Sequence, residues 1–196
     1  MSAKRKVAWQ QFSNEIQATY VKRGLLKSDK IEATFQNWQI VYDFFTMPIG
    51  AVVAIYTRIR TPFVVKSDFK FRISKKNFLN KVAEKFRDSD VTTGDSRIDD
   101  IFVIQSNSAE KVKNLLSDEK IKALLLGKAD LDFEVSHGYS GIGRQFPNNG
   151  DGLSLVVLYE SRDKDRLMLI YNLFGEILTS LLEASDIDDA PNHIKL

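Results

Sequence analysis

Hydrophobic side chains recur at every second position along three successive stretches of the chain, and this alternation limits the folds available to it. A side-chain period of two is typical of a β-strand with two different faces. The three sets are Trp38, Ile40, Tyr42 and Phe44; Val53, Ile55, Thr57 and Ile59; and Phe69, Phe71 and Ile73. Because the connections are short, and Pro48 and Gly50 suit a turn, the sequence predicts an antiparallel meander of three strands.

Helical spacing marks both ends of the chain. A period of four from Ala8 to Tyr20, followed by Gly24, predicts an amphipathic helix. A broad apolar stripe from Leu167 to Leu182 predicts a long C-terminal helix. Between them, the pattern predicts helices that begin near Ser74, Asn107 and Ser117, and strands at 101–105, 131–135 and 153–159.

Strands and helices do not alternate strictly in this order, which determines the expected fold class. The sequence predicts an α+β fold: an antiparallel or mixed sheet of about six strands, with helices mainly on one side and the long C-terminal helix packed on the sheet. At 196 residues, 43% of them hydrophobic, the chain is long enough for one buried core. We expect a single α+β domain at 1–185 and an acidic tail at 186–196 that frays.

Composition argues against several kinds of chemistry. The chain has no cysteine, so disulfides, cysteine zinc sites and thiol nucleophiles are excluded. His137 and His193 are its two histidines, and they do not support a Ser-His-Asp triad. An enzyme that uses carboxylates such as Asp43 or Glu134 remains a minor alternative. We expect no catalytic residues, no metal and no cofactor.

The expected location follows from the hydrophobic runs. The longest apolar run, Met47 to Ile55, includes Pro48 and Gly50 and is about half of the ~20 residues that a membrane-spanning helix needs. The residues after Lys4 to Lys6 lack the apolar core of a signal peptide. We therefore expect a cytoplasmic protein without a transmembrane segment.

Charge is unevenly distributed although the net charge is only +2. Ten basic and two acidic residues lie between Arg58 and Arg87, and the balance reverses between Asp88 and Glu110. The basic segment contains phenylalanines, a composition that also occurs in RNA-binding sheets. However, the alternation places Phe69 and Phe71 on the face opposite Lys70. Core phenylalanines and a solvated basic face are therefore expected, without nucleic-acid binding.

Two loops contain residues that other proteins use as ligands. Asp90, Asp95, Asp99 and Asp100 lie close in sequence, but their spacing does not match an EF-hand. A structural turn is favoured, with Gly94 at positive φ and aspartates that accept bonds from local amides, over a carboxylate metal site. The glycine-rich loop from His137 to Gly152 lacks the order of a phosphate-binding loop, so a flexible hairpin connection is expected.

Several stretches together resemble a family of uncharacterised bacterial proteins, a domain of unknown function. The matching residues are Trp38, Ile40 and Asp43; Tyr56 to Arg60 with Pro62 and Phe63; Phe69, Phe71 and Ile73; Asp90, Gly94, Asp95 and Asp99; Phe102, Ile104 and Asn107; and the segments Lys111 to Leu126 and Leu167 to Leu182. Ile98 departs from the pattern, where the family has an aromatic residue. The resemblance covers nearly the whole chain and implies one domain, without an assigned activity.

Three functional hypotheses follow. The favoured one is a non-catalytic protein- or ligand-binding module with an unknown protein or small-molecule partner. The second is an apolar small-molecule-binding domain with a cavity between the sheet and the C-terminal helix. The third is an enzyme that uses carboxylates and arginines, which needs a cleft where Asp43, Arg58 or Asp99 converge. The candidate binding residues are Asp43, Tyr56, Arg58, Arg60, Asp95 and Asp99.

Overall fold

The computed structural model describes residues 3–23, 28–49, 51–63, 66–76, 89–127, 131–136, 146, 151–158 and 162–188. The helices are α1 Ala3–Glu15, α2 Ser96–Asp99, α3 Ala109–Leu115, α4 Glu119–Leu126 and α5 Lys164–Glu183. The strands are β1 Thr19–Val21, β2 Lys30–Phe35, β3 Trp38–Ile49, β4 Val52–Pro62, β5 Phe71–Lys75, β6 Ser89–Asp90, β7 Phe102–Ser106, β8 Leu131–Ser136 and β9 Gly152–Leu158.

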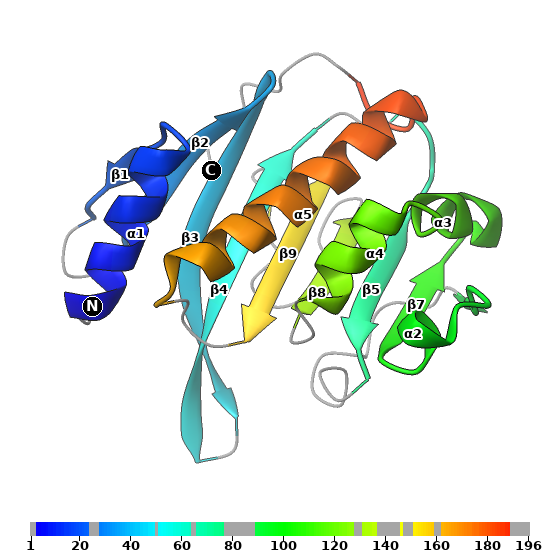
Figure 1. Cartoon of the computed structure of the whole chain (residues 1–196), viewed down its shortest axis with the longest axis horizontal. Helices are drawn as coiled ribbons and strands as arrows, with labels where there is room; N and C mark the ends of the chain where they lie inside the picture. Colours follow the sequence, from blue (N-terminus) through cyan, green and yellow to red (C-terminus); the bar gives the residue numbers. More distant parts are fainter. Residues whose placement is uncertain are drawn as a thin grey trace.

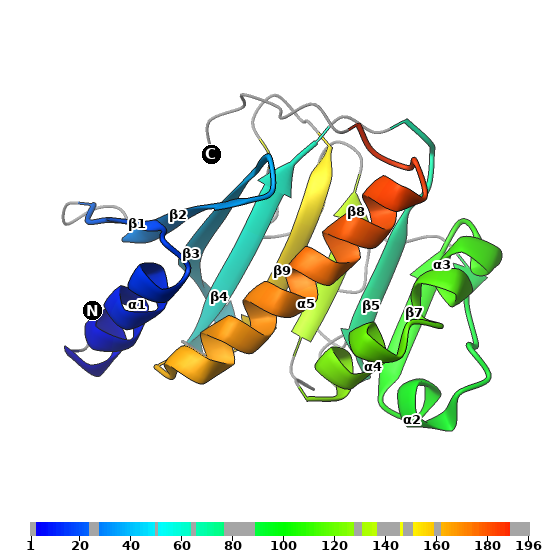
Figure 2. The same ribbon diagram turned by 45° about the horizontal axis from the view of Figure 1, so that its top comes forward.

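The strands form one nine-stranded sheet with the order β1-β2-β3-β4-β9-β8-β5-β7-β6. Every described strand pair is antiparallel. Figures 1 and 2 show α1, α4 and α5 over the same face of this sheet. The predicted α+β class with a long C-terminal helix on the sheet is therefore confirmed, and the sheet is larger than the expected six strands.

The core lies between α1, α5 and the sheet. The inner stripe of α5 is buried along its whole length, at Leu167, Ile170, Leu173, Phe174, Ile177, Leu178 and Leu181. Each such side chain contributes about 1.5–3 kcal/mol through the apolar surface it removes from water. Aromatic rings join the layers: the ring centres of Phe12 and Tyr42 are 5.1 Å apart, and those of Phe133 and Phe174 are 5.8 Å apart.

The predicted meander is wrong for its third strand. β3 and β4 form the expected hairpin, with Asp43 opposite Arg58. However, β9 and β8 lie between β4 and β5, and β5 pairs with β7 and β8. The pattern of β5 is the same beside either neighbour, because alternation reports which face is apolar and not which strand pairs with it.

Several element boundaries differ from the predicted ones. α1 ends at Glu15, because Gln17 takes a positive φ of 54° and the chain enters β1, which contains Tyr20. Ser74 lies in β5 and does not cap a helix, and the helix expected after it falls at 77–88, outside the described residues. β3 also continues through Pro48, where a turn was expected.

Two predicted helix caps are each displaced by one residue. Ser108 accepts a bond from the Lys111 amide at the start of α3, and Asp118 accepts from the amides of Lys120 and Ile121 at the start of α4. Asn107, the expected cap of α3, instead joins separate segments. Its Oδ1 accepts from the Lys70 amide at 2.8 Å, and its Nδ2 donates to the Asp68 carbonyl at 2.7 Å.

The packed body extends into the segment expected to fray. Asp186 and Ile187 are buried. The Ser67 hydroxyl donates to the Asp186 carboxylate at 2.6 Å, and the Lys66 amide donates to its carbonyl oxygen at 2.9 Å. Lys111 forms a further ion pair with the Asp186 carboxylate. These bonds hold residues 186–187 against the domain.

Candidate functional site

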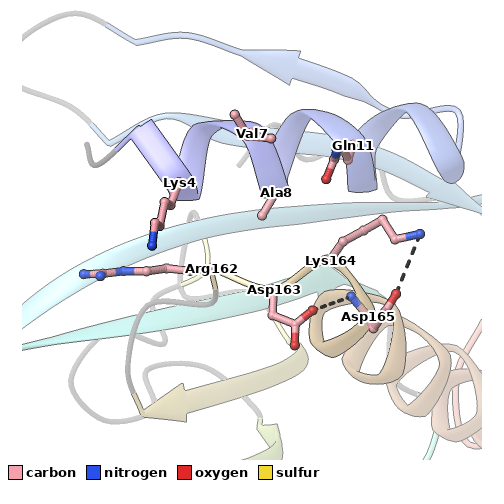
Figure 3. Close-up of a pocket in the computed structure, with 8 residues that line it drawn as sticks. All are labelled: Lys4, Val7, Ala8, Gln11, Arg162, Asp163, Lys164 and Asp165. Atoms are coloured by element: carbon pink, nitrogen blue, oxygen red, sulfur yellow. Dashed lines mark hydrogen bonds and ion pairs between the residues drawn. The ribbon is translucent and has the colours of Figure 1, made fainter.

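A groove of about 610 Å³ lies between α1 and the beginning of α5. Figure 3 shows the side chains of both helices that border it. α1 contributes Lys4, Val7, Ala8 and Gln11, the first residues of α5 contribute Lys164 and Asp165, and the two residues before α5 contribute Arg162 and Asp163. The volume falls within the range of small-molecule sites, about 300–1,000 Å³.

The groove combines an apolar strip with a cationic end. Val7 is 52% exposed, one of two large hydrophobic residues exposed in the described part of the chain. Ala8 lies beside it on α1 and points toward α5 (Figure 3). At one end of the groove the side chains of Lys4 and Arg162 approach each other (Figure 3). The groove thus has an apolar and a cationic part, and the acidic residues Asp163 and Asp165 also border it.

The start of α5 is held by local bonds. The Asp163 carboxylate accepts a hydrogen bond from the Asp165 amide at 3.0 Å and caps the helix. Lys164 reaches across to α1, where its Nζ is 2.6 Å from Glu15 Oε2. This bond raises the pKa of Lys164. The aligned amides of a 20-residue helix add partial positive charge at this end of the groove.

The opposite face of the sheet carries a buried ionic cluster. Phe44 contacts α1, so the adjacent Asp43 points away from the helices. The Asp43 carboxylate accepts bonds from Arg58 Nε at 2.7 Å and Arg58 Nη2 at 2.5 Å. Arg60 Nη2 donates to the same carboxylate at 3.2 Å. The Asp43 carboxylate is thus paired with two arginines.

Two further features complete this part of the cluster. Burial lowers the pKa of Arg60 to about 10, the neighbouring Arg58 acts in the same direction, and Asp43 opposes both. The guanidinium therefore remains charged at neutral pH. Tyr56 stacks on Phe45 with ring centres 5.2 Å apart, and Arg58 lies 5.3 Å from the centre of the same Phe45 ring.

Polar residues continue along this face toward β5. Arg72 and Asp132 form a buried two-bond ion pair. The expected solvated basic face is therefore wrong for Arg72. Its side chain is buried, and Asp132 of the neighbouring strand β8 neutralises its charge. Among the described residues, the buried hydroxyls of Ser74 and Ser154 have no hydrogen-bond partner. Phe146 lies over Gly152 on the same face, so close that a Cβ on Gly152 would be 2.4 Å from its ring.

The aspartate loop at 90–100 is built from local bonds. Gly94 has a positive φ of 88°. Asp99 accepts from the Thr93 amide and hydroxyl and from the Gly94 amide at 2.8–2.9 Å. Burial acts to raise the pKa of Asp99, but these bonds outweigh it and lower the pKa. The predicted structural turn is confirmed in these contacts.

Asp95 serves the same loop. It caps α2 through the Arg97 amide and forms a two-bond pair with the Arg97 side chain at 2.6–2.9 Å. Lys122 Nζ of α4 lies 3.2 Å from its carboxylate. The bond from Arg97 is the largest cause that lowers the pKa of Asp95. Asp95 therefore links the N-terminal end of α2 to α4.

The structure brings together four of the six candidate residues. Asp43, Tyr56, Arg58 and Arg60 share one face of β3 and β4, whereas Asp99 lies on α2 beside β7, beyond β9, β8 and β5. Asp43 and Arg58 therefore meet in an ion pair, and Asp99 lies apart from them. Sequence reasoning missed the groove, since its residues come from two helices far apart in the chain.

Two kinds of feature, a metal-ligand cluster and a membrane-spanning helix, are not found among the described residues. No group of three or more histidine, cysteine, aspartate or glutamate residues there has the arrangement of a metal site. In the same residues no helix is both long and apolar enough to cross a membrane.

Comparison with known proteins finds similarity to a solved structure. No protein-family model matches the chain, and no curated protein does, so the resemblance to a bacterial family stays a prediction. The crystal structure of the mycobacterial trehalose monomycolate transport factor A, TtfA, superposes with a TM-score of 0.54. The match covers 92% of this chain and 96% of that chain at 10% sequence identity. At this identity, the similarity establishes a shared fold.

Proposed function

We propose that this chain is a non-catalytic binding module that takes up the anionic head of a small amphiphilic molecule in the groove between α1 and α5. The observation that carries the proposal is that an exposed apolar residue, Val7, and two cations, Lys4 and Arg162, border the same groove. An exposed apolar side chain near two positive charges is complementary to a ligand that has an apolar portion and an anionic head.

The other two candidate sites are less suited to binding a ligand than the groove is. The charges around Asp43 neutralise each other in buried contacts, which leaves them structural. The inner face of α5 packs directly on sheet residues, as Phe174 does on Phe133, where the cavity hypothesis expected space. The shared fold of a protein described as a trehalose monomycolate transport factor gives a reason to test lipid-like ligands first.

The test is calorimetric titration with dodecyl phosphate, kept below its micelle concentration. Dodecyl maltoside, with the same chain and an uncharged head, serves as the comparison ligand. We expect dodecyl phosphate to bind more tightly, because its head pairs with Lys4 and Arg162. Removal of either cation should weaken binding roughly tenfold, as for a charge-assisted bond.

The chain offers a matched control for this test. Lys4→Gln removes a groove cation, whereas Lys6→Gln removes an exposed cation of the same helix that does not border the groove. Equal affinities for dodecyl phosphate in these two variants would rule out the proposed head-group site. Absence of heat with both ligands would rule out the groove as an amphiphile site.

A further inference from the structure

The β3–β4 hairpin extends beyond the rest of the sheet (Figure 1). β2 pairs with β3 only as far as Tyr42, and β9 pairs with β4 only from Thr57 onward. Within the described part of the chain, residues 45–49 therefore pair only with residues 52–56. At the rise of a β-strand, these two stretches, which together we term the apolar arm, project about 16 Å.

The apolar arm is hydrophobic on both of its faces. Between Asp43 and Arg58 the sequence contains no charged residue. Alternation places Pro48 and Val53 on one face of the arm and Ala54 on the other. Val53 is 66% exposed. An exposed hydrophobic side chain on a projecting arm that has no charged residue is the feature from which we argue an interaction site.

The base of the apolar arm adjoins a cationic end of the molecule. The Arg5 guanidinium lies 4.0 Å from the centre of the Phe44 ring, so the first turn of α1 contacts β3 just before the arm begins. Lys4 and Lys6 are exposed on this turn. Arg162 belongs to the same end, because it borders the groove together with Lys4.

We propose that the apolar arm docks this protein onto an anionic lipid bilayer, with its tip in the headgroup region and the cations near its base attracted by the negative surface potential of the bilayer. A bilayer surrounds an inserted arm and so accommodates apolar side chains on both faces, while anionic lipids complement Lys4 and Lys6. Insertion stays shallow, because the outer backbone groups of a two-stranded arm need water.

A second copy of the chain is the main competing occupant, and the arm is poorly suited to it. Strand addition requires a regular row of backbone donors along an edge. Pro48, in the middle of the projecting part of β3, has no N–H to donate. The arm therefore lacks one donor that a paired strand would use.

The experiment measures binding of the full chain to vesicles. Co-sedimentation with phosphatidylcholine vesicles is compared with co-sedimentation with phosphatidylcholine–phosphatidylglycerol vesicles. Val53→Asp changes the tip at an exposed position, and Ala123→Asp adds the same charge at an exposed position of α4. Because the chain has no cysteine, Val53→Cys and Ala123→Cys each allow a polarity-sensitive dye to be attached at one place.

We expect the protein to sediment with the phosphatidylglycerol vesicles and less with phosphatidylcholine alone. Val53→Asp should lower the partition coefficient roughly tenfold or more, since it removes an apolar contact and adds repulsion. Ala123→Asp should match the original chain. The dye at position 53 should shift to the blue on vesicles, and the dye at 123 should not.

Three outcomes would overturn the proposal: no sedimentation with either vesicle, equal sedimentation of Val53→Asp and the original chain, or a dimer in ultracentrifugation that Val53→Asp abolishes. Circular dichroism confirms that each variant is folded. Dodecyl phosphate titration of Val53→Asp separates this proposal from the groove, because position 53 does not border the groove and titration should be unchanged.

Discussion

Arg72 of β5 and Asp132 of β8 form an ion pair with two hydrogen bonds across adjacent strands, and both side chains are almost completely buried. Nε donates to Oδ1 at 2.9 Å and Nη2 donates to Oδ2 at 2.8 Å. The pair lies on the sheet face opposite the helices. It connects two segments that are 60 residues apart in sequence, so it helps to specify which strands become neighbours.

Asp132→Ala should destabilise the protein strongly, because Arg72 would keep a buried charge without its carboxylate. Loss of one partner of a buried ion pair costs about 3–5 kcal/mol. Urea denaturation would measure the change in the free energy of unfolding. The double variant Arg72→Leu/Asp132→Leu should lose much less, since it buries no charge. A double variant as unstable as Asp132→Ala would show that the pair is not the cause.

Asp43→Asn should destabilise the β3–β4 region, because Arg58 and Arg60 both donate to the Asp43 carboxylate. We expect a loss of about 3 kcal/mol, since two neighbouring guanidinium groups would share a neutral acceptor. Asp68→Asn, at an exposed position, is the matched control and should change stability by less than about 0.5 kcal/mol. Thermal and urea unfolding of the two variants test this contrast directly.

Asp99→Asn should reduce stability at neutral pH and change its dependence on acid. The folded-state pKa of Asp99 lies below its ordinary value, so its stabilising contribution is present above the unfolded pKa of about 3.9 and is lost as pH falls through the folded value. The difference from the original chain should be about 1 kcal/mol at neutral pH and should shrink below pH ~4. Urea unfolding at several pH values measures it.

The neighbouring carboxylate provides a comparison for this prediction. Asp100→Asn alters an exposed residue of the same loop and should leave both the stability and its acid dependence close to those of the original chain. A difference between Asp99→Asn and the original chain that is constant from neutral to acid pH would contradict the ionic role of Asp99.

Gly175→Ala should destabilise the protein although alanine is the better helix former. A Cβ at position 175 would lie 2.5 Å from Cε2 of Phe35, and overpacking of this kind costs about 1–3 kcal/mol. The gain in helix propensity is only about 1 kcal/mol. We therefore expect a lower melting temperature, and partial recovery in Gly175→Ala/Phe35→Leu, where the smaller side chain gives room. If the double variant is as unstable as Gly175→Ala, the contact with Phe35 is not the cause of the lost stability.

Local spacing alone predicts the core-facing residues of strands such as β5. The alternation of Phe71 and Ile73 with Arg72 is read from neighbouring positions, and the structure places Phe71 and Ile73 in the core. The same holds for α5, where the apolar stripe defines the buried side. These features depend on side chains two to four positions apart, and such spacings are fixed by backbone geometry.

Three features depend on contacts between distant parts of the chain: the strand order, the burial of charged residues on the sheet face opposite the helices, and the groove. Nothing near Arg72 in sequence indicates that Asp132 neutralises it, and nothing near Lys4 indicates that Arg162 lies across from it (Figure 3). Strand pairing and burial of a charge depend on the free energy of contacts between distant segments. Local periodicity contains no information about these contacts. The six expected strands became nine because short pieces such as β1 and β6 are stabilised by their longer neighbours and have little pattern of their own.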